Sequence, residues 1–306
     1  MRVDNVGSLP PIDIEEFSRI VSERYVQGDP ETIWALREPL AALAQNTNLM
    51  FSKMLESLEA RNGKALVTDQ PTYHMLHRTK GWSLRLTIWM PESANKDVRI
   101  LENNVFAYDY PHDHNFDLLT TNVAGVGYET DVLEHGGIDP GSDVGDIVDA
   151  TPLGRKRLSP GTVFLYEGCK DVHSQVPVDS ITLALNFIPY SPANSARSQY
   201  SYRITDEEKL EILGSPLSYE QREMGLVRLL GKLAAAGHHG VSGPLQTLAG
   251  QSRNPRVRDY ATHLKHLVAT RDDTMHEDLR EQIDRNHLAV KYNRVAAMRR
   301  EALGVD

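Results

Sequence analysis

The sequence has little cysteine, few aromatic residues and no long apolar run. Among its 306 residues, Cys169 is the one cysteine, and aromatic residues make up 7% of the chain. A single cysteine excludes an internal disulfide and is typical of a reducing compartment. No apolar run approaches the roughly 18 residues that a membrane-spanning helix needs. These absences predict a globular protein that folds around an apolar core without crosslinks.

Basic residues are also in the minority. The chain has 33 Lys and Arg against 42 Asp and Glu, which gives a formal net charge of −9 spread along the chain. Nucleic acids and anionic membranes both need a basic face on their partner. The charge balance therefore argues against both as partners and favours a small-molecule substrate. The first residues lack the basic and then apolar pattern of a secretory signal, so we expect a cytoplasmic protein.

Hydrophobic periodicity divides the chain into three segments, which we predict to be its domains. Residues 1–64 and 204–306 carry apolar residues at steps of three and four, as helices do, whereas residues 65–203 carry short alternating or β-branched runs. Six or more such strands without a helix-length insert predict an antiparallel sandwich or barrel. The predicted fold class is a mainly β core flanked by N-terminal helices and a C-terminal all-α region.

Local signals predict individual elements. Asp29 has the character of a helix N-cap followed by Pro30 at the first helical position, and Pro39 predicts a kink or break in the same helix. Strands are predicted for four runs among others, and a helix for the run DEEKLEILG near the start of the last segment. The four runs are WSLRLTIW (82–89), NNVFAYDY (103–110), YETDVLE (128–134) and ITLALNFIPYS (181–191).

Two histidines one residue apart, His112 and His114, are the strongest chemical signal. Residues i and i+2 of a strand point to the same face, so a strand that begins near Tyr110 would aim both imidazoles into one cavity. A first-row metal needs a third protein ligand. His173, which follows a Pro-Gly turn and an apolar strand, is the candidate. The alternative is that the rings simply occupy a strand face.

These histidines and the residues around them resemble those of a known protein family. Residues 73–192 resemble a cupin, and within the cupins they resemble the thiol dioxygenases of the cysteine dioxygenase type. The matching motifs are HDH at 112–114, GVGYE ending at Glu129, His173, and PYSP at 189–192. Leu118 and Leu119 stand where a general cupin carries a glutamate ligand, so the resemblance implies a cupin-type antiparallel β-barrel with a three-histidine site. Glu129 or Asp117 then remain as outer groups.

The resemblance implies a non-haem iron(II) oxygenase, most simply a dioxygenase, that acts on a small amino-acid-like metabolite with dioxygen. It places Tyr190 near the metal and gives Glu129 a catalytic part. Imidazole ligands alone do not choose among iron, nickel, copper, manganese and zinc. Arg78 and Arg85 are candidates to bind a substrate carboxylate, because the guanidinium group matches it with two parallel hydrogen bonds.

Two other functions stay open from the sequence. One is a redox-neutral metal cupin, such as an isomerase, a lyase or a hydrolase. The other is a cupin without catalysis that binds a ligand and acts through its helices as an interaction module. The helical segments are longer than a minimal thiol dioxygenase needs. The sequence therefore allows a lid, a macromolecular substrate or a homodimer formed through the helical regions.

Overall fold

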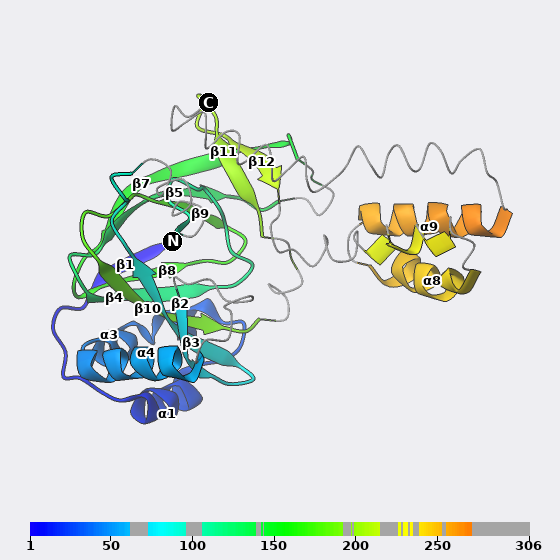
Figure 1. Cartoon of the computed structure of the whole chain (residues 1–306). Coiled ribbons are helices and arrows are strands. Elements are labelled where there is room, and N and C mark those ends of the chain that lie inside the picture. Colours follow the sequence, from blue (N-terminus) through cyan, green and yellow to red (C-terminus); the bar gives the residue numbers. More distant parts are fainter. Residues whose placement is uncertain are drawn as a thin grey trace. The chain divides into compact units, whose positions relative to one another are not determined.

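The computed structural model describes two compact units of the chain (Figure 1). The first unit comprises residues 1–137, 149–196 and 204–210, and the second comprises residues 138–148, 197–203 and 211–306. Within these bounds the described residues are 1–61, 73–95, 106–138, 142, 144–191, 197, 199–214, 226, 227, 229–231, 233, 234, 239–252 and 255–270.

Two antiparallel sheets make up the β core of the first unit. One has the strand order β1-β8-β4-β10-β3-β2, and the other has the order β7-β5-β9. The strands of the first sheet are β1 (Arg2–Asn5), β2 (Tyr73–Arg78), β3 (Trp82–Trp89), β4 (Leu118–Ala124), β8 (Thr162–Tyr166) and β10 (Thr182–Pro189). Those of the second are β5 (Tyr128–His135), β7 (Ala150–Leu158) and β9 (Asp171–Gln175). The predicted fold class, a mainly β core with helices at both ends of the chain, is confirmed.

Side-chain alternation divides the large sheet into two faces. On β3, Leu84 and Leu86 are fully buried in one apolar cluster with the N-terminal helices. A second cluster joins the other face of the large sheet to the small sheet, with Tyr166 from β8 and Tyr128 from β5 among its members. This second cluster is the interior of the β core. Arg85, which alternates with Leu84 and Leu86, stands on the interior face.

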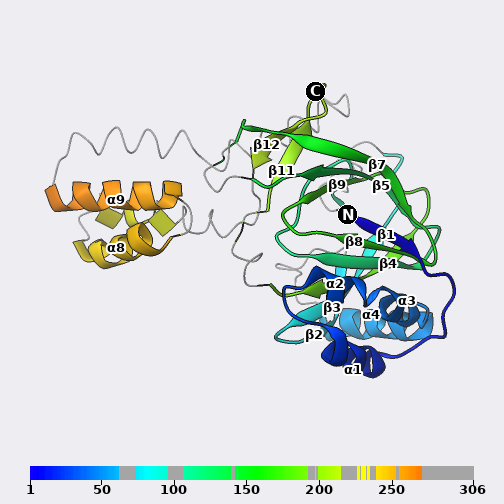
Figure 2. The same cartoon turned by 180° about the vertical axis from the view of Figure 1, so that it is seen from behind.

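Four N-terminal helices cover the outer face of the large sheet (Figure 2). They are α1 (Ile14–Arg24), α2 (Pro30–Trp34), α3 (Arg37–Ala44) and α4 (Thr47–Arg61). Phe17 of α1 is fully buried and makes edge-to-face contacts with Trp82 of β3 and Phe187 of β10. Burial of one such side chain stabilises the fold by roughly 1.5–3 kcal/mol.

The predicted helix start at Asp29 is confirmed, because its carboxylate accepts a hydrogen bond from the Glu31 amide. The predicted break at Pro39 is wrong by a few residues. The chain breaks between Trp34 and Arg37, and Pro39 lies in the first turn of α3. In that turn the missing N–H of proline leaves no intrahelical hydrogen bond unmade.

Two further element predictions need correction. Within NNVFAYDY, the described residues from Phe106 onward form no strand, and Tyr108 makes a single bridge to Gln175. The end of DEEKLEILG is a strand, β12 (Leu210–Gly214), in which every residue is buried. A short apolar run that is buried on both faces shows neither the period of a helix nor that of a strand, so its sequence does not distinguish the two.

The second unit holds most of a small sheet and the C-terminal helices. The sheet has the order β11-β12-β6, with β11 (Ser201–Ile204) and β6 (Ile147–Val148). The helical part has η1 (His239–Val241), α8 (Ser242–Gln251) and α9 (Pro255–Thr270), joined through Leu245, Val257 and Leu264. The helices predicted beyond residue 270 lie outside the described residues, and the three-domain division stays a prediction. No helix in the described part of the chain has the length and hydropathy to cross a membrane.

Candidate metal centre

Three imidazoles meet at the β core. The ligand nitrogens of His112, His114 and His173 all lie within 4.8 Å of one another, so the group can hold a metal ion. The ring centroids are 5.0 Å apart for the first two residues, and His173 lies 4.5 and 4.9 Å from them. Three borderline-soft nitrogen donors of this kind suit first-row metals.

The backbone that brings the first two histidines together differs from the predicted strand. His112 is not part of a strand and makes one antiparallel bridge to His173 of β9. In that bridge the His112 amide donates to the His173 carbonyl at 3.0 Å, and the His173 amide donates back at 2.9 Å. The carbonyl of His114 accepts a hydrogen bond from the Cys169 amide. Main-chain contacts thus hold both histidines without a regular strand.

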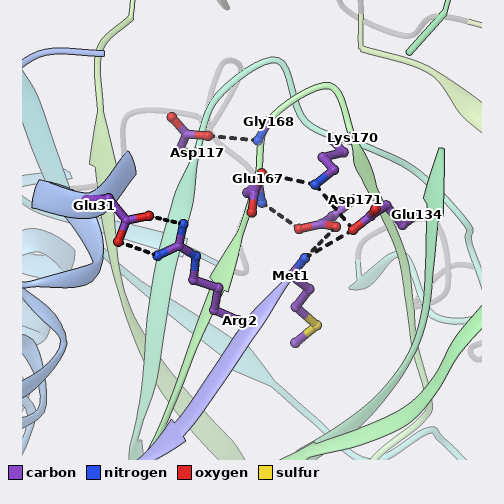
Figure 3. Close-up of polar contacts among 9 residues, drawn as sticks. All are labelled: Met1, Arg2, Glu31, Asp117, Glu134, Glu167, Gly168, Lys170 and Asp171. Carbon is purple, nitrogen blue, oxygen red and sulfur yellow. Dashed lines mark hydrogen bonds and ion pairs between the residues drawn. The ribbon is translucent and has the colours of Figure 1, made fainter. Parts of the chain in front are cut away.

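The turn that precedes β9 is held by polar contacts (Figure 3). Asp117 accepts a hydrogen bond from the Gly168 amide at 2.8 Å, and Asp171 accepts one from the Glu167 amide at 2.6 Å. The other carboxylate oxygen of Asp171 lies 2.9 Å from the ammonium of Met1. Cys169, also in this turn, is buried and has a left-handed backbone, with φ of 58°. These contacts hold the turn that leads into β9 and His173.

Aromatic side chains surround the imidazoles. The ring of Phe116 stacks on His114 with centroids 4.5 Å apart, and the ring of Tyr166 lies 4.4 Å from that of His173. Burial raises the pKa of Tyr166 well above its usual value and raises that of Tyr128 to about 12. Both phenols are therefore neutral and protonated at neutral pH.

Burial keeps His114 and His173 neutral. The exposed fraction is 9% for His114 and 3% for His173. Burial lowers the pKa of both well below the usual value, and the neighbouring imidazoles and Arg85 lower it further. A neutral imidazole offers one nitrogen lone pair to a metal. The donor set and its protonation thus fit a divalent first-row ion.

Arg85 of β3 is the predicted substrate-binding residue that the structure brings to this site. Its guanidinium carbon lies 5.8 Å from the ring centroid of Phe116, which stacks on His114. Arg85 is close enough to depress the pKa of His114 and of His173. A fixed cation therefore stands beside the histidines on the interior face of the core.

Arg78 and Tyr190 are brought to each other. The guanidinium carbon of Arg78 lies 5.9 Å from the ring centroid of Tyr190. The backbone of Tyr190 donates to the Gly81 carbonyl at 2.8 Å, just beyond the end of β10. The pair thus forms a cation–π contact next to the turn between β2 and β3, and any part that it plays at a metal remains a proposal.

Glu129 lies on the opposite face of its strand from the interior. Tyr128 and Val132, on the other face of β5, belong to the interior cluster, whereas the Glu129 carboxylate lies 3.8 Å from Arg155 and 3.6 Å from Arg157 of β7. Its side chain is 39% exposed. The structure therefore does not bring Glu129 to the histidines, because i and i+1 of a strand point to opposite faces.

Sequence reasoning missed three neighbours of the histidines: Phe116, Tyr166 and Gln175. Gln175 is 3% exposed, and its Nε2 lies 2.9 Å from Nδ1 of His173. The i, i+2 spacing of His173 and Gln175 on one strand was a signal available in the sequence.

The comparisons with known proteins identify fold likenesses of low similarity. No protein-family model matches the chain, and no curated protein matches its sequence. Among solved structures, the DMSP lyase DddQ from Ruegeria pomeroyi DSS-3 is similar over 44% of this chain and 53% of its own, with 13% identity and a TM-score of 0.25. The chain thus spans about half of the length of that lyase.

Two further structures are similar at the same level. Hydroquinone 1,2-dioxygenase from Sphingomonas sp. TTNP3 matches 43% of this chain and 72% of its own, with 11% identity and a TM-score of 0.27. A cupin domain from Bordetella pertussis Tohama I matches 40% of this chain and 99% of its own, with 10% identity and a TM-score of 0.24. Each of these likenesses covers less than half of the present chain.

Proposed function

We propose that this chain is a metal-dependent oxygenase that uses iron(II) and dioxygen on a small, amino-acid-like metabolite. The observation that carries the proposal is the convergence of His112, His114 and His173 within 4.8 Å. Three neutral imidazoles leave a divalent ion its full charge and open positions for other ligands. A bound iron(II) ion would supply electron transfer between substrate and dioxygen, which zinc does not.

The chain's own residues prepare the site for such chemistry. Arg85 supplies a fixed cation that can pair with a substrate carboxylate through two parallel hydrogen bonds. Phe116 packs on His114 and Tyr166 packs on His173, and both imidazoles are buried. A carboxylate on Arg85 would therefore lie next to the histidine group, as an amino-acid-like substrate requires.

Of the other predicted site residues, two are kept in the proposal and one is not. Arg78 and Tyr190 form a second candidate contact for the substrate, because they present a cation and a phenol at one end of the large sheet. Glu129 has no part in the proposed site, since its carboxylate is paired with arginines on the outer face.

A redox-neutral metal enzyme is the second candidate. The observation that favours it is the neutral phenol of Tyr166 beside His173, because a phenol that stays protonated can donate a hydrogen bond to an oxygen atom of a substrate. Such an enzyme would need no oxygen.

Metal analysis of protein purified without added metal tests the site. We expect near-stoichiometric iron in the wild type, none in the His173→Ala variant, and the wild-type content in a His263→Ala control, which removes an exposed histidine of α9. Oxygen uptake with a library of amino acids and thiols then tests the reaction. Metal without oxygen uptake would favour the redox-neutral enzyme, and no first-row metal even with anaerobic iron(II) would leave a ligand-binding module.

A further inference from the structure

A row of polar side chains crosses the large sheet on its interior face. Arg85 of β3 lies opposite Asn186 of β10, and Asn186 lies opposite Thr120 of β4. Thr120 in turn lies opposite Phe164 of β8, which belongs to the interior cluster. Residues directly opposite each other in a sheet point to the same face. The side chains of Arg85 and Thr120 are therefore both directed into the β core.

Two phenols, one from each of the facing sheets, meet this row. Tyr166 comes from β8 of the large sheet and Tyr128 from β5 of the small sheet, and both belong to the interior cluster. The hydroxyl of Tyr128 approaches those of Tyr166 and Thr120, and the guanidinium of Arg85 is near it as well. We call Thr120, Tyr128 and Tyr166 the hydroxyl cluster. It brings three hydroxyl groups together beside a cation.

The hydroxyl cluster is buried, but its hydrogen bonds are incomplete. The exposed fraction is 0% for Thr120, 1% for Tyr166 and 5% for Tyr128. Neither the Thr120 nor the Tyr166 hydroxyl makes a hydrogen bond of good geometry to any residue in the described part of the chain. Among the same residues this also holds for Nδ2 of Asn122 and Nε1 of Trp89, which line the same interior. Buried polar groups nearly always have a hydrogen-bond partner, so several exceptions on one face indicate a partner from outside the chain.

We propose that the hydroxyl cluster binds a hydroxyl group of the substrate while Arg85 binds its carboxylate. The inference deepens the proposed function and rests on it for the carboxylate at Arg85. Each hydroxyl of the cluster both donates and accepts, and a ligand hydroxyl does the same. A charged group in this place would need an opposite charge to offset its burial, which the three neutral side chains do not offer. The substrate class is therefore a small carboxylic acid with a hydroxyl group at its other end.

The register limits the length of such a substrate. β3 and β4 are two strand spacings apart, which is about 10 Å. The side chain of Arg85 spans part of this distance, so a short carbon chain separates the carboxylate from the hydroxyl. The ring of Tyr166 lies 4.4 Å from that of His173, and Arg85 contacts Phe116, which stacks on His114. A substrate that joins Arg85 to the hydroxyl cluster would therefore lie alongside the histidine group.

Calorimetric titration of the purified protein with small acids tests the proposal. The probes are 3-hydroxypropanoate, 4-hydroxybutanoate and 5-hydroxypentanoate, each compared with the acid in which a methyl group replaces the hydroxyl: butanoate, pentanoate and hexanoate. We expect at least one hydroxy acid to bind about 10-fold or more tightly than its methyl counterpart, because the methyl group leaves the hydroxyl cluster unpaired. If none of the hydroxy acids has this preference, the cluster holds at most ordered water and the proposal is wrong.

Two variants test the cluster itself, since each removes one hydroxyl and keeps the shape of the side chain. In Tyr166→Phe and in Thr120→Val, the affinity for the hydroxy acid should fall close to that for its methyl counterpart. Thr121→Val is the matched control, because Thr121 is buried on the other face of β4 and its hydroxyl donates to the Thr162 carbonyl at 2.8 Å. This control should keep the preference. An undiminished preference in both cluster variants would overturn the assignment.

Stability separates a binding role from a structural one. A hydroxyl that awaits a ligand contributes no hydrogen bond to the fold, so Tyr166→Phe should unfold at the same urea concentration as the wild type or at a higher one. A clearly lower midpoint would show that the Tyr166 hydroxyl serves the fold, and the proposed subsite would be wrong.

The titrations and the metal analysis can succeed or fail separately. Metal and oxygen uptake without a preference for hydroxy acids would overturn the hydroxyl cluster alone. The preference in a protein that holds no first-row metal would support the subsite and remove the oxygenase. Equal affinity for 4-hydroxybutanoate and 4-hydroxybutanamide would overturn the carboxylate contact at Arg85, and with it the proposed substrate class.

Discussion

The guanidinium of Arg85 and the ring of Phe116 are in cation–π contact, with 5.8 Å between the guanidinium carbon and the ring centroid. Phe116 in turn stacks on His114. This relationship connects β3 of the large sheet with the loop that bears two of the histidines. It also places a cation next to the aromatic ring that packs on one of the proposed ligands.

Arg85 should therefore decide the preference for carboxylate substrates. Arg85→Lys keeps the charge but loses the paired donors, and Arg85→Met loses both, so we expect kcat/KM to fall by about 10- to 100-fold in Arg85→Met and by less in Arg85→Lys. The measurement compares a carboxylate substrate with its amide. Arg155→Met, at an exposed arginine of β7, is the control. An equal loss for the acid and for the amide would contradict a role in binding the carboxylate.

Metal binding should stabilise the first unit of the chain. A ligand that binds only the folded state at about 100 times its Kd adds about 2.7 kcal/mol. We expect Co²⁺ or Zn²⁺ to raise the melting temperature of one calorimetric transition by several degrees, and a chelator to reverse the change. The shift should vanish in His112→Ala and persist in His263→Ala. A shift of equal size in both variants would place the metal elsewhere.

Gly168 should be intolerant of a side chain. A Cβ at this position would lie 2.7 Å from the carbonyl carbon of Phe116, two residues after His114. Gly168→Ala must displace that backbone, so we expect a loss of about 1–3 kcal/mol in the free energy of unfolding together with weaker metal binding. Gly136→Ala, where no atom lies within 4 Å, is the control. If Gly168→Ala gives the same urea unfolding curve and the same Zn²⁺ titration as the wild type, the turn accommodates a side chain and the prediction is wrong.

The carboxyl group of Asp117 gives a prediction about pH. Burial raises its pKa, and the hydrogen bond from the Gly168 amide opposes this increase only in part. A raised pKa means that the folded state holds the proton more tightly. Its contribution to stability is then complete at acid pH, below the unfolded value, and is lost as the pH rises through the folded value.

Asp117→Asn should therefore unfold at a higher urea concentration than the wild type at pH 7, and at a similar one near pH 4, because the amide oxygen still accepts from Gly168 without a charge to bury. The exposed Asp206→Asn serves as the surface-charge control. An Asp117→Asn variant that is less stable at pH 7 would show that the charge itself stabilises the turn.

Alternating strands were predictable because one face of each is apolar. WSLRLTIW coincides with β3 from Trp82 to Trp89. Alternation separates Arg85 from Leu84 and Leu86, but it does not show which face lines the interior, because the leucines are buried against the N-terminal helices. In YETDVLE, alternation separates Glu129 and Asp131 from Tyr128, which lies in the interior cluster. A residue that matches a motif must therefore also lie on the strand face that points to the site.

Other features depend on contacts that no local pattern contains. β1 was not predicted, because a strand of four residues that pairs only with β8 has too few residues to show a period. The bridge between His112 and His173 joins an irregular segment to β9, and neither segment alone specifies it. Spacing predicted which histidines to consider, but the pairing that brings their rings together is tertiary.

The reciprocal main-chain hydrogen bonds between His112 and His173 use no side-chain atom. The backbone contacts that position the site therefore do not depend on which side chains serve as ligands. A ligand residue can be replaced while these contacts stay. A carboxylate at position 112 would convert the group into two histidines and one carboxylate, the facial triad of many non-haem iron oxygenases. This fold thus offers a scaffold on which two ligand sets for iron can be compared within one unchanged backbone.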